Sequence, residues 1–167
     1  MRDRLTEQDI QKIKEEIEHR RLVVRKEALE AVKEARAHGD LSENFEYHAA
    51  KKDKNQNESR IRYLERMLKT AIVVKDESGD DEVGLNNTVT IHFEEENEDE
   101  TYRIVTSVRG NSLGGMISIE SPIGRALLGH KIGDKVKIQV NDQISYFVTI
   151  KEIVKTVDES ADILRKF

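Results

Sequence analysis

The sequence predicts an α+β protein: an N-terminal antiparallel α-helical coiled-coil hairpin, then a small antiparallel sheet domain with one short helix. Three observations support this prediction. Residues 5–38 contain no Pro or Gly and carry apolar residues mostly at steps of three and four. Only a short break around Gly39 separates them from a second charged helical segment. After residue 75 the pattern changes to short runs that alternate polar and apolar residues.

The composition favours a thin helical element joined to a small compact domain. Charged residues make up 37% of the chain, against roughly 25% in an ordinary domain, and there is no Trp. The absence of Cys excludes disulfides and thiolate metal sites and fits a reducing cytoplasm, where we expect the protein. The N-terminus has no apolar signal region, and no apolar run is long enough for a membrane span.

Charge is distributed unevenly along the chain. Residues 1–75 hold 18 Lys and Arg against 15 Asp and Glu, a net charge of +3, whereas residues 76–167 hold 10 against 18, a net charge of −8. An acidic protein is a poor general ligand for duplex nucleic acid. Basic patches on the first part could still contact a phosphate backbone.

The first helix is expected to run from about Leu5 to His38, with Thr6 and Asp9 in the N-cap and first-turn positions. About 33 residues at 1.5 Å each give a helix of roughly 50 Å. Its narrow apolar seam suits one partner helix, although Arg20 interrupts it. Gly39 is expected to end the helix. The predicted seam is Ile10, Ile13, Ile17, Val24, Ala28, Ala31 and Ala35.

The second helix is expected to run to about Ala71, antiparallel to the first because the connection is short. Its middle, residues 51–60, is nearly all polar, so the seam there is thin. The predicted domains are residues 1–75 as the arm with an acidic tip at 39–47, 76–83 as an acidic linker, and 84–157 as the sheet domain. The predicted apolar seam of the second helix is Tyr47, Ala50, Ile61, Leu64, Leu68 and Ala71.

The sheet domain is predicted from two hairpins and one short helix. Strands are expected at residues 88–93 and 101–105 around an acidic loop, at 116–119, and at 135–140 and 145–153. Pro122 at a first helical position predicts a short helix that Gly129 ends. The tail, residues 158–167, is expected to be a short helix or a frayed end.

The tip between the two helices carries three carboxylates, Asp40, Glu43 and Glu46, at three-residue spacing. One interpretation is structural: Asp40 is a good N-cap, Glu43 completes a capping-box-like pair, and Ser42 could cap instead. The other is that Asp40 and Glu43 bind a divalent cation, since Mg²⁺ takes one or two carboxylates together with waters and phosphate oxygens. Two carboxylates alone make no tight site, so a partner would have to complete it.

Two segments resemble known signatures. Residues 39–51, which begin Gly-Asp-Leu-Ser-Glu-Asn-Phe-Glu-Tyr, resemble the tip motif of the bacterial Gre transcript-cleavage factors, the GreA/GreB family. Residues 121–129 with Gly133 and Asp134 resemble that family's C-terminal signature. The likeness runs in order from about Leu5 to Ile153 and implies a coiled-coil arm followed by an FKBP-like domain.

The resemblance implies a function in transcription. The C-terminal domain would dock on RNA polymerase and the arm would enter its secondary channel. Asp40 and Glu43 would act catalytically by helping to hold a Mg²⁺ shared with the polymerase, which stimulates hydrolysis of backtracked RNA. Contact near the tip with the polymerase or the nascent RNA 3′ end is expected from Arg36, Phe45, Tyr47 and Lys51. The protein would be a monomeric accessory factor, not an enzyme, that holds no cofactor tightly by itself.

Other interpretations stay open. Arg36 and Lys51 could instead be solvated or ion-paired, and Tyr47 fits seam packing better than chemistry. Phe45 stands where the family usually has Ala, which keeps a second hypothesis: a channel-binding regulator that competes or inhibits without stimulating cleavage. A third, a peptidyl-prolyl isomerase, is weak because such pockets are aromatic-lined and residues 84–157 offer four aromatic side chains, Phe93, Tyr102, Tyr146 and Phe147.

Overall fold

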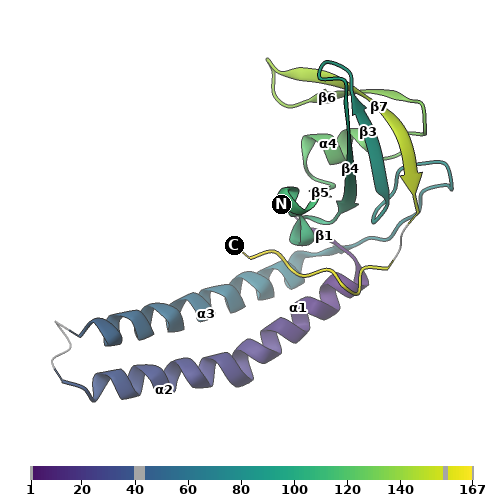
Figure 1. Ribbon diagram of the computed structural model, residues 1–167. Coiled ribbons are helices and arrows are strands. Elements are labelled where there is room, and N and C mark those ends of the chain that lie inside the picture. The colour runs from purple at the N-terminus through teal and green to yellow at the C-terminus, as the bar shows by residue number, and fades with distance from the viewer. Residues whose placement is uncertain (1, 40–43, 156–157, 167) are drawn as a thin grey trace. The chain divides into compact units, whose positions relative to one another are not determined.

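The computed structural model describes residues 2–39, 44–155 and 158–166. The chain divides into two compact units, a hairpin unit of residues 1–3 and 10–71 and a sheet unit of residues 4–9 and 72–167. The hairpin unit is a helical hairpin and the sheet unit a curled, largely antiparallel sheet with one short helix (Figure 1), so the predicted fold class is confirmed.

The hairpin is built from three α-helices and one π-helical turn. α1 (Glu7–His19) continues through a π-helix (Arg20–Val24) into α2 (Arg25–Arg36), and α3 (Phe45–Thr70) returns antiparallel to α2 (Figure 1). The prediction of one uninterrupted α-helix from Leu5 was therefore wrong in two places. Residues Arg4–Leu5 form a short strand, β1, and five residues wind as a π-helix.

The apolar seam follows the prediction on both sides of the π-helix, with one exception. Ile13, Ile17, Ile61 and Leu64 are buried as expected. From the end of the π-helix onward, Ala35 is buried and Val24 and Ala28 are partly buried as expected, whereas Ala31 is exposed and its neighbour Val32 is partly buried.

A polar network surrounds Arg20, the residue that interrupts the predicted apolar seam. The Glu16 carboxylate accepts from Arg20 Nε at 2.7 Å, from Arg60 Nε at 2.8 Å and from Arg60 Nη2 at 3.3 Å. Arg20 Nη1 also donates to Asn57 Oδ1 at 3.0 Å. Burial raises the pKa of Glu16, but the hydrogen bonds from Arg60 and Arg20 outweigh it and leave that pKa lowered. The polar middle of the hairpin is thus held by charge-assisted hydrogen bonds.

Five strands form the sheet of the sheet unit, in the order β5-β4-β3-β7-β6. The predicted hairpins are confirmed as two antiparallel pairs, β3 with β4 and β6 with β7. β5 pairs in parallel with β4, so the expectation of a purely antiparallel sheet was wrong at this edge. The strands are β3 (Thr88–Phe93), β4 (Glu98–Val105), β5 (Met116–Ser118), β6 (Lys135–Gln139) and β7 (Ser145–Val154).

Helix α4 (Pro122–Leu127) packs on this sheet as predicted, with Ser121 as its N-cap. Ser121 Oγ accepts from Gly124 N at 3.1 Å. Gly124 is required because a Cβ there would lie 2.0 Å from the carbonyl oxygen of Ser118. Leu127 joins a core drawn from every strand of the sheet. The most buried members of that core are Val83, Val89, Ile91, Ile104, Leu127, Ile138, Val148 and Ile150.

The chain segment before the sheet is part of the sheet unit. β1 (Arg4–Leu5) pairs in parallel with β2 (Ile72–Val73). Residues 76–83, expected to be a linker, end in the core residue Val83, and Lys155 Nζ donates to the carbonyl oxygens of Gly79 and Glu82 at 2.9 and 2.8 Å. This acidic stretch is held against the sheet by a lysine.

The tail beyond the sheet is neither a helix nor a frayed end. Residues 158–166 follow an irregular path with one turn at residues 160–161, and Glu159 is buried. Two short 3₁₀-helices, η2 (Ser107–Arg109) and η3 (Ser112–Gly114), precede β5. None of the helices in the described parts of the chain is both long and apolar enough to cross a membrane.

Candidate functional site

The candidate site is the turn of the hairpin, between the end of α2 and the start of α3. α2 ends at Arg36, where the N–H of Ala37 still bonds to Glu34 O at 3.1 Å. Gly39 has a φ of +123°, a conformation that favours glycine, but the C-cap of α2 is Ala37, so the prediction of Gly39 as the cap residue was wrong by two positions. Asp40 and Glu43, the predicted metal-binding pair, lie outside the described residues.

Asn44, which sequence reasoning missed, is the residue that caps α3. Its Oδ1 accepts from the N–H of Tyr47 at 3.0 Å, and its Nδ2 donates to the carbonyl oxygen of Ala35 at 2.6 Å. One side chain therefore starts α3 and ties it to the last turn of α2. The prediction of Asp40 or Ser42 as the N-cap was wrong, because the N-cap of α3 is Asn44. The signal was available, since Asn is among the strongest N-cap residues.

Arg36 and Tyr47 come together across the hairpin. The Arg36 guanidinium carbon lies 5.6 Å from the centroid of the Tyr47 ring. A hydrogen bond from Arg36, followed by the nearby charge of Lys51, holds the pKa of the Tyr47 hydroxyl below its usual value. His48 packs edge-on to the same ring, with 5.5 Å between centroids. Arg36 is thus engaged by an aromatic ring in the free chain.

Phe45 and Lys51 present their side chains to solvent. Phe45 is the first residue of α3 and is 85% exposed. Lys51 follows Tyr47 by one helical turn and is also exposed. The roles of Arg36, Phe45, Tyr47 and Lys51 as contact residues stay predictions, but the structure places these four side chains on the two helix ends that flank the turn.

Glu46, the third acidic residue of the tip, already has a partner. His38 Nδ1 lies 3.0 Å from a Glu46 carboxylate oxygen, and both side chains are exposed. Within the described ranges no group of three or more His, Cys, Asp or Glu side chains has the geometry to hold a metal ion. A metal held here would need Asp40, Glu43 and groups from outside the chain.

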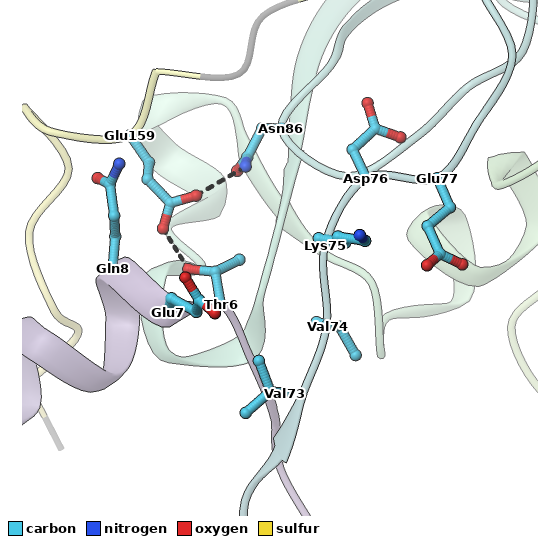
Figure 2. A pocket seen from close by; sticks show the side chains of 10 residues that line it. All are labelled: Thr6, Glu7, Gln8, Val73, Val74, Lys75, Asp76, Glu77, Asn86 and Glu159. Carbon is cyan, nitrogen blue, oxygen red and sulfur yellow. Dashed lines mark hydrogen bonds between the residues drawn. The ribbon is translucent and has the colours of Figure 1, made fainter.

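The sheet unit contains two larger cavities. One, of about 830 Å³, is lined by polar and charged side chains that include Thr6, Lys75 and Glu159 (Figure 2). The other, of about 770 Å³, is more apolar and has one aromatic side chain in its lining, Tyr146. Neither has the aromatic lining expected of a peptidyl-prolyl isomerase, so they give that hypothesis no support.

Comparison with known proteins covers nearly the whole chain. Residues 4–73 match the family model described as "Transcription elongation factor, N-terminal", and residues 71–155 match "Transcription elongation factor, GreA/GreB, C-term". The chain is 41% identical over 149 residues to transcription elongation factor GreA of Macrococcus caseolyticus, covering 89% of this chain and 94% of that protein. It is 45% identical over 137 residues to GreA of Thermoanaerobacter pseudethanolicus, covering 81% and 87%.

Solved structures also match over nearly the whole chain. The GreA factor homolog 1 protein of Thermus thermophilus is 26% identical, with coverage of 93% of this chain and 100% of that one and a TM-score of 0.43.

Proposed function

Because the chain belongs to the GreA/GreB family of transcription elongation factors, we propose that it binds RNA polymerase through the secondary channel and stimulates hydrolytic cleavage of backtracked nascent RNA. The chain would act as an accessory factor, since the polymerase would supply the rest of the reactive centre. Its partners would be the polymerase and the 3′ end of the nascent RNA.

The observation that carries this proposal is the pair Asp40 and Glu43 in the turn between α2 and α3. Two carboxylates are hard oxygen donors of the kind that Mg²⁺ prefers, and two are too few for a tight site. They would therefore hold the ion jointly with the polymerase. When bound, the ion supplies a water of lowered pKa for attack on a phosphodiester.

The described side chains around the turn would orient the tip and meet the RNA. Asn44 joins the two helix ends, so the turn is anchored on both sides by one residue. Lys51 is a solvent-exposed cation one turn from Tyr47, and a phosphate of the RNA 3′ segment is its natural partner. Arg36 would either stay on the Tyr47 ring or leave it for a phosphate.

A second candidate function follows from Phe45. An 85% exposed phenyl ring beside the turn adds bulk where the family usually has Ala. If the ring prevents the carboxylates from approaching the reactive centre, the protein would occupy the channel and regulate the polymerase without stimulating cleavage.

The direct test is cleavage of RNA in a stalled, backtracked elongation complex. Asp40→Ala and Glu43→Ala should each abolish stimulated cleavage while polymerase binding stays within about twofold. Glu46→Gln is the matched control, because it removes a tip carboxylate that is paired with His38, and it should cleave like the unmodified protein. Full activity in both Ala variants would refute the role of these residues.

Phe45→Ala separates the two candidate functions in the same assay. If the protein is a cleavage factor, this variant should stay within about twofold of the unmodified chain. If the unmodified chain binds the polymerase but does not cleave, and Phe45→Ala gains cleavage, the ring is the element that blocks the reaction and the second function holds.

A further inference from the structure

The buried guanidinium of Arg109 lies at the centre of a cluster of charges in the sheet unit. Its side chain is fully buried, and Nε lies 2.8 Å from an oxygen of Asp9 in the first turn of α1. That one carboxylate already neutralises it. Two further carboxylates nevertheless approach the same guanidinium, and both come from residues 158–166, which we term the C-terminal segment.

The first of these carboxylates belongs to Glu159. One oxygen accepts a short hydrogen bond from Thr6 Oγ1, and the other accepts from Asn86 Nδ2 at 2.8 Å (Figure 2). Glu159 is buried at 4% exposure. A carboxylate that receives a separate donor on each oxygen occupies a built receptor, because both donors would be left unpaired without it.

The second carboxylate, that of Asp162, bridges two guanidinium groups. Its Oδ1 accepts from Arg103 Nη1 at 2.6 Å and its Oδ2 accepts from Arg109 Nη1 at 2.8 Å. Arg103 Nη2 also donates to the carbonyl oxygen of Asp158 at 2.8 Å. Guanidinium–carboxylate bridges of this kind are among the strongest polar contacts in proteins.

One donor of the cluster is unused. Arg109 Nη2 is buried and makes no hydrogen bond with any described group, and the nearest oxygen of Glu159 lies 3.8 Å away, too far for a direct bond. The C-terminal segment therefore fills the receptor incompletely. We call the receptor formed by Thr6, Asn86, Arg103 and Arg109 the carboxylate notch.

The notch and the C-terminal segment differ in whether they lie within the part of the chain that matches the family. All four notch residues lie within the family match, which ends at residue 155, whereas both carboxylates lie beyond it. The segment is irregular, and its backbone contact with the sheet unit includes the bond from Arg165 N to Val108 O at 2.6 Å. A segment without helix or strand opens at a lower free-energy cost than the core strands of a sheet do.

From these observations we propose that the notch is a carboxylate-binding site for an acidic peptide, and that in the free chain the C-terminal segment is its ligand. Arg109 and Arg103 supply the positive charge, and Thr6 and Asn86 supply the neutral donors that fix the orientation of one carboxylate. The site is a local positive region in a part of the chain, residues 76–167, whose net charge is −8. This proposal does not depend on the proposed function in transcription.

The test uses the full chain and a fluorescently labelled synthetic peptide with the sequence of residues 158–167. A tethered segment competes at an effective concentration in the millimolar range, so the unmodified chain should bind the peptide weakly. The variant Glu159→Gln/Asp162→Asn, which weakens the tethered ligand, should bind it at least about tenfold more tightly. Adding Arg103→Gln to that variant should abolish binding, and a peptide with the same Gln and Asn changes should not bind.

Equal binding by the unmodified chain and the double variant, or no binding by a folded double variant, would overturn the proposal. If the double variant does not fold, amide hydrogen exchange in the unmodified chain decides. The Arg165 amide should exchange slowly, and excess unlabelled peptide should accelerate it by at least about fivefold, whereas the Gln/Asn peptide should not. Exchange at the random-coil rate without peptide, or no acceleration by it, would refute the assignment.

Discussion

Glu16→Gln tests whether the polar network holds the middle of the arm. The substitution keeps the shape of the side chain but removes the charge that receives three hydrogen bonds from Arg20 and Arg60. Arg60 then loses this ion pair, although its side chain is only 8% exposed. The local helical propensity is nearly unchanged, so a decrease in the free energy of unfolding would report on the network.

The expected decrease in the free energy of unfolding lies between two limits. Breaking a fully buried ion pair costs about 3–5 kcal/mol, whereas an exposed pair contributes about 1 kcal/mol or less. The Glu16 side chain is 23% exposed, so we expect a loss of about 2–3 kcal/mol. For a chain of this size this corresponds to a decrease in Tm of roughly 5–10 °C.

The same carboxylate makes the stability of the arm dependent on pH. The pKa of Glu16 is lowered in the folded chain from its ordinary value of 4.5. A group with a depressed folded pKa contributes stability above its unfolded pKa, and that contribution is lost as the pH falls through the folded value. The unmodified arm should therefore lose stability below about pH 4.5 more steeply than the Gln variant does.

Thermal unfolding followed by far-UV circular dichroism measures both effects, and hydrogen exchange of the α3 amides near Asn57 assigns them to the arm. Glu15→Gln is the matched control. It removes the same charge from the neighbouring residue, whose exposed side chain accepts a hydrogen bond from Gln11 Nε2 at 3.2 Å. A loss for Glu16→Gln no larger than that for Glu15→Gln would show that the network does not stabilise the arm.

Three further substitutions test other parts of the chain. Asn44→Ala removes the cap of α3 and its bond to α2, and should cost about 1–2 kcal/mol with faster hydrogen exchange in the first turn of α3. Gly124→Ala places a Cβ 2.0 Å from the Ser118 carbonyl oxygen and should destabilise the sheet unit by about 3 kcal/mol in urea unfolding. Lys155→Met removes the ammonium that donates to Gly79 and Glu82, and should speed proteolysis within residues 76–82 several-fold.

Matched controls make each result interpretable. Asn55→Ala changes an exposed Asn in the interior of α3 and should not destabilise the helix. In Gly79→Ala the new Cβ would lie 3.4 Å from its nearest atom, so the stability should hardly change. Lys151→Met removes an exposed lysine of β7 and should leave proteolysis unchanged. Effects in a control as large as in its partner would contradict the corresponding contact.

Much of the fold is readable from local patterns. Strict alternation over residues 88–93 predicts β3, and Ser121 followed by Pro122 predicts the start of α4, because the period of apolar residues and the cap residues depend on neighbours in the chain. The break at Gly39 has the same local origin, and it locates the tip and its carboxylates without any tertiary information.

Features that depend on residues far apart in the sequence could not be predicted from local patterns. Arg20 looked like a flaw in an apolar seam because its partner Asn57 is 37 residues away. The parallel pairing of β5 with β4 likewise joins residues whose register no local pattern specifies. Such contacts are decided by which arrangement buries the apolar surface while pairing nearly all buried polar groups.

By itself, the sequence determined that the chain has a charged helical hairpin with an acidic turn, followed by a small sheet domain. The reason is that helix and strand periods, caps and turns are properties of short segments. Only the tertiary structure decided that Asn44 caps α3, and that an irregular tail supplies carboxylates to the buried Arg109. Burying a guanidinium requires counter-charges in three dimensions, and Asp9, Glu159 and Asp162 are brought to Arg109 from opposite ends of the chain by the folded sheet unit.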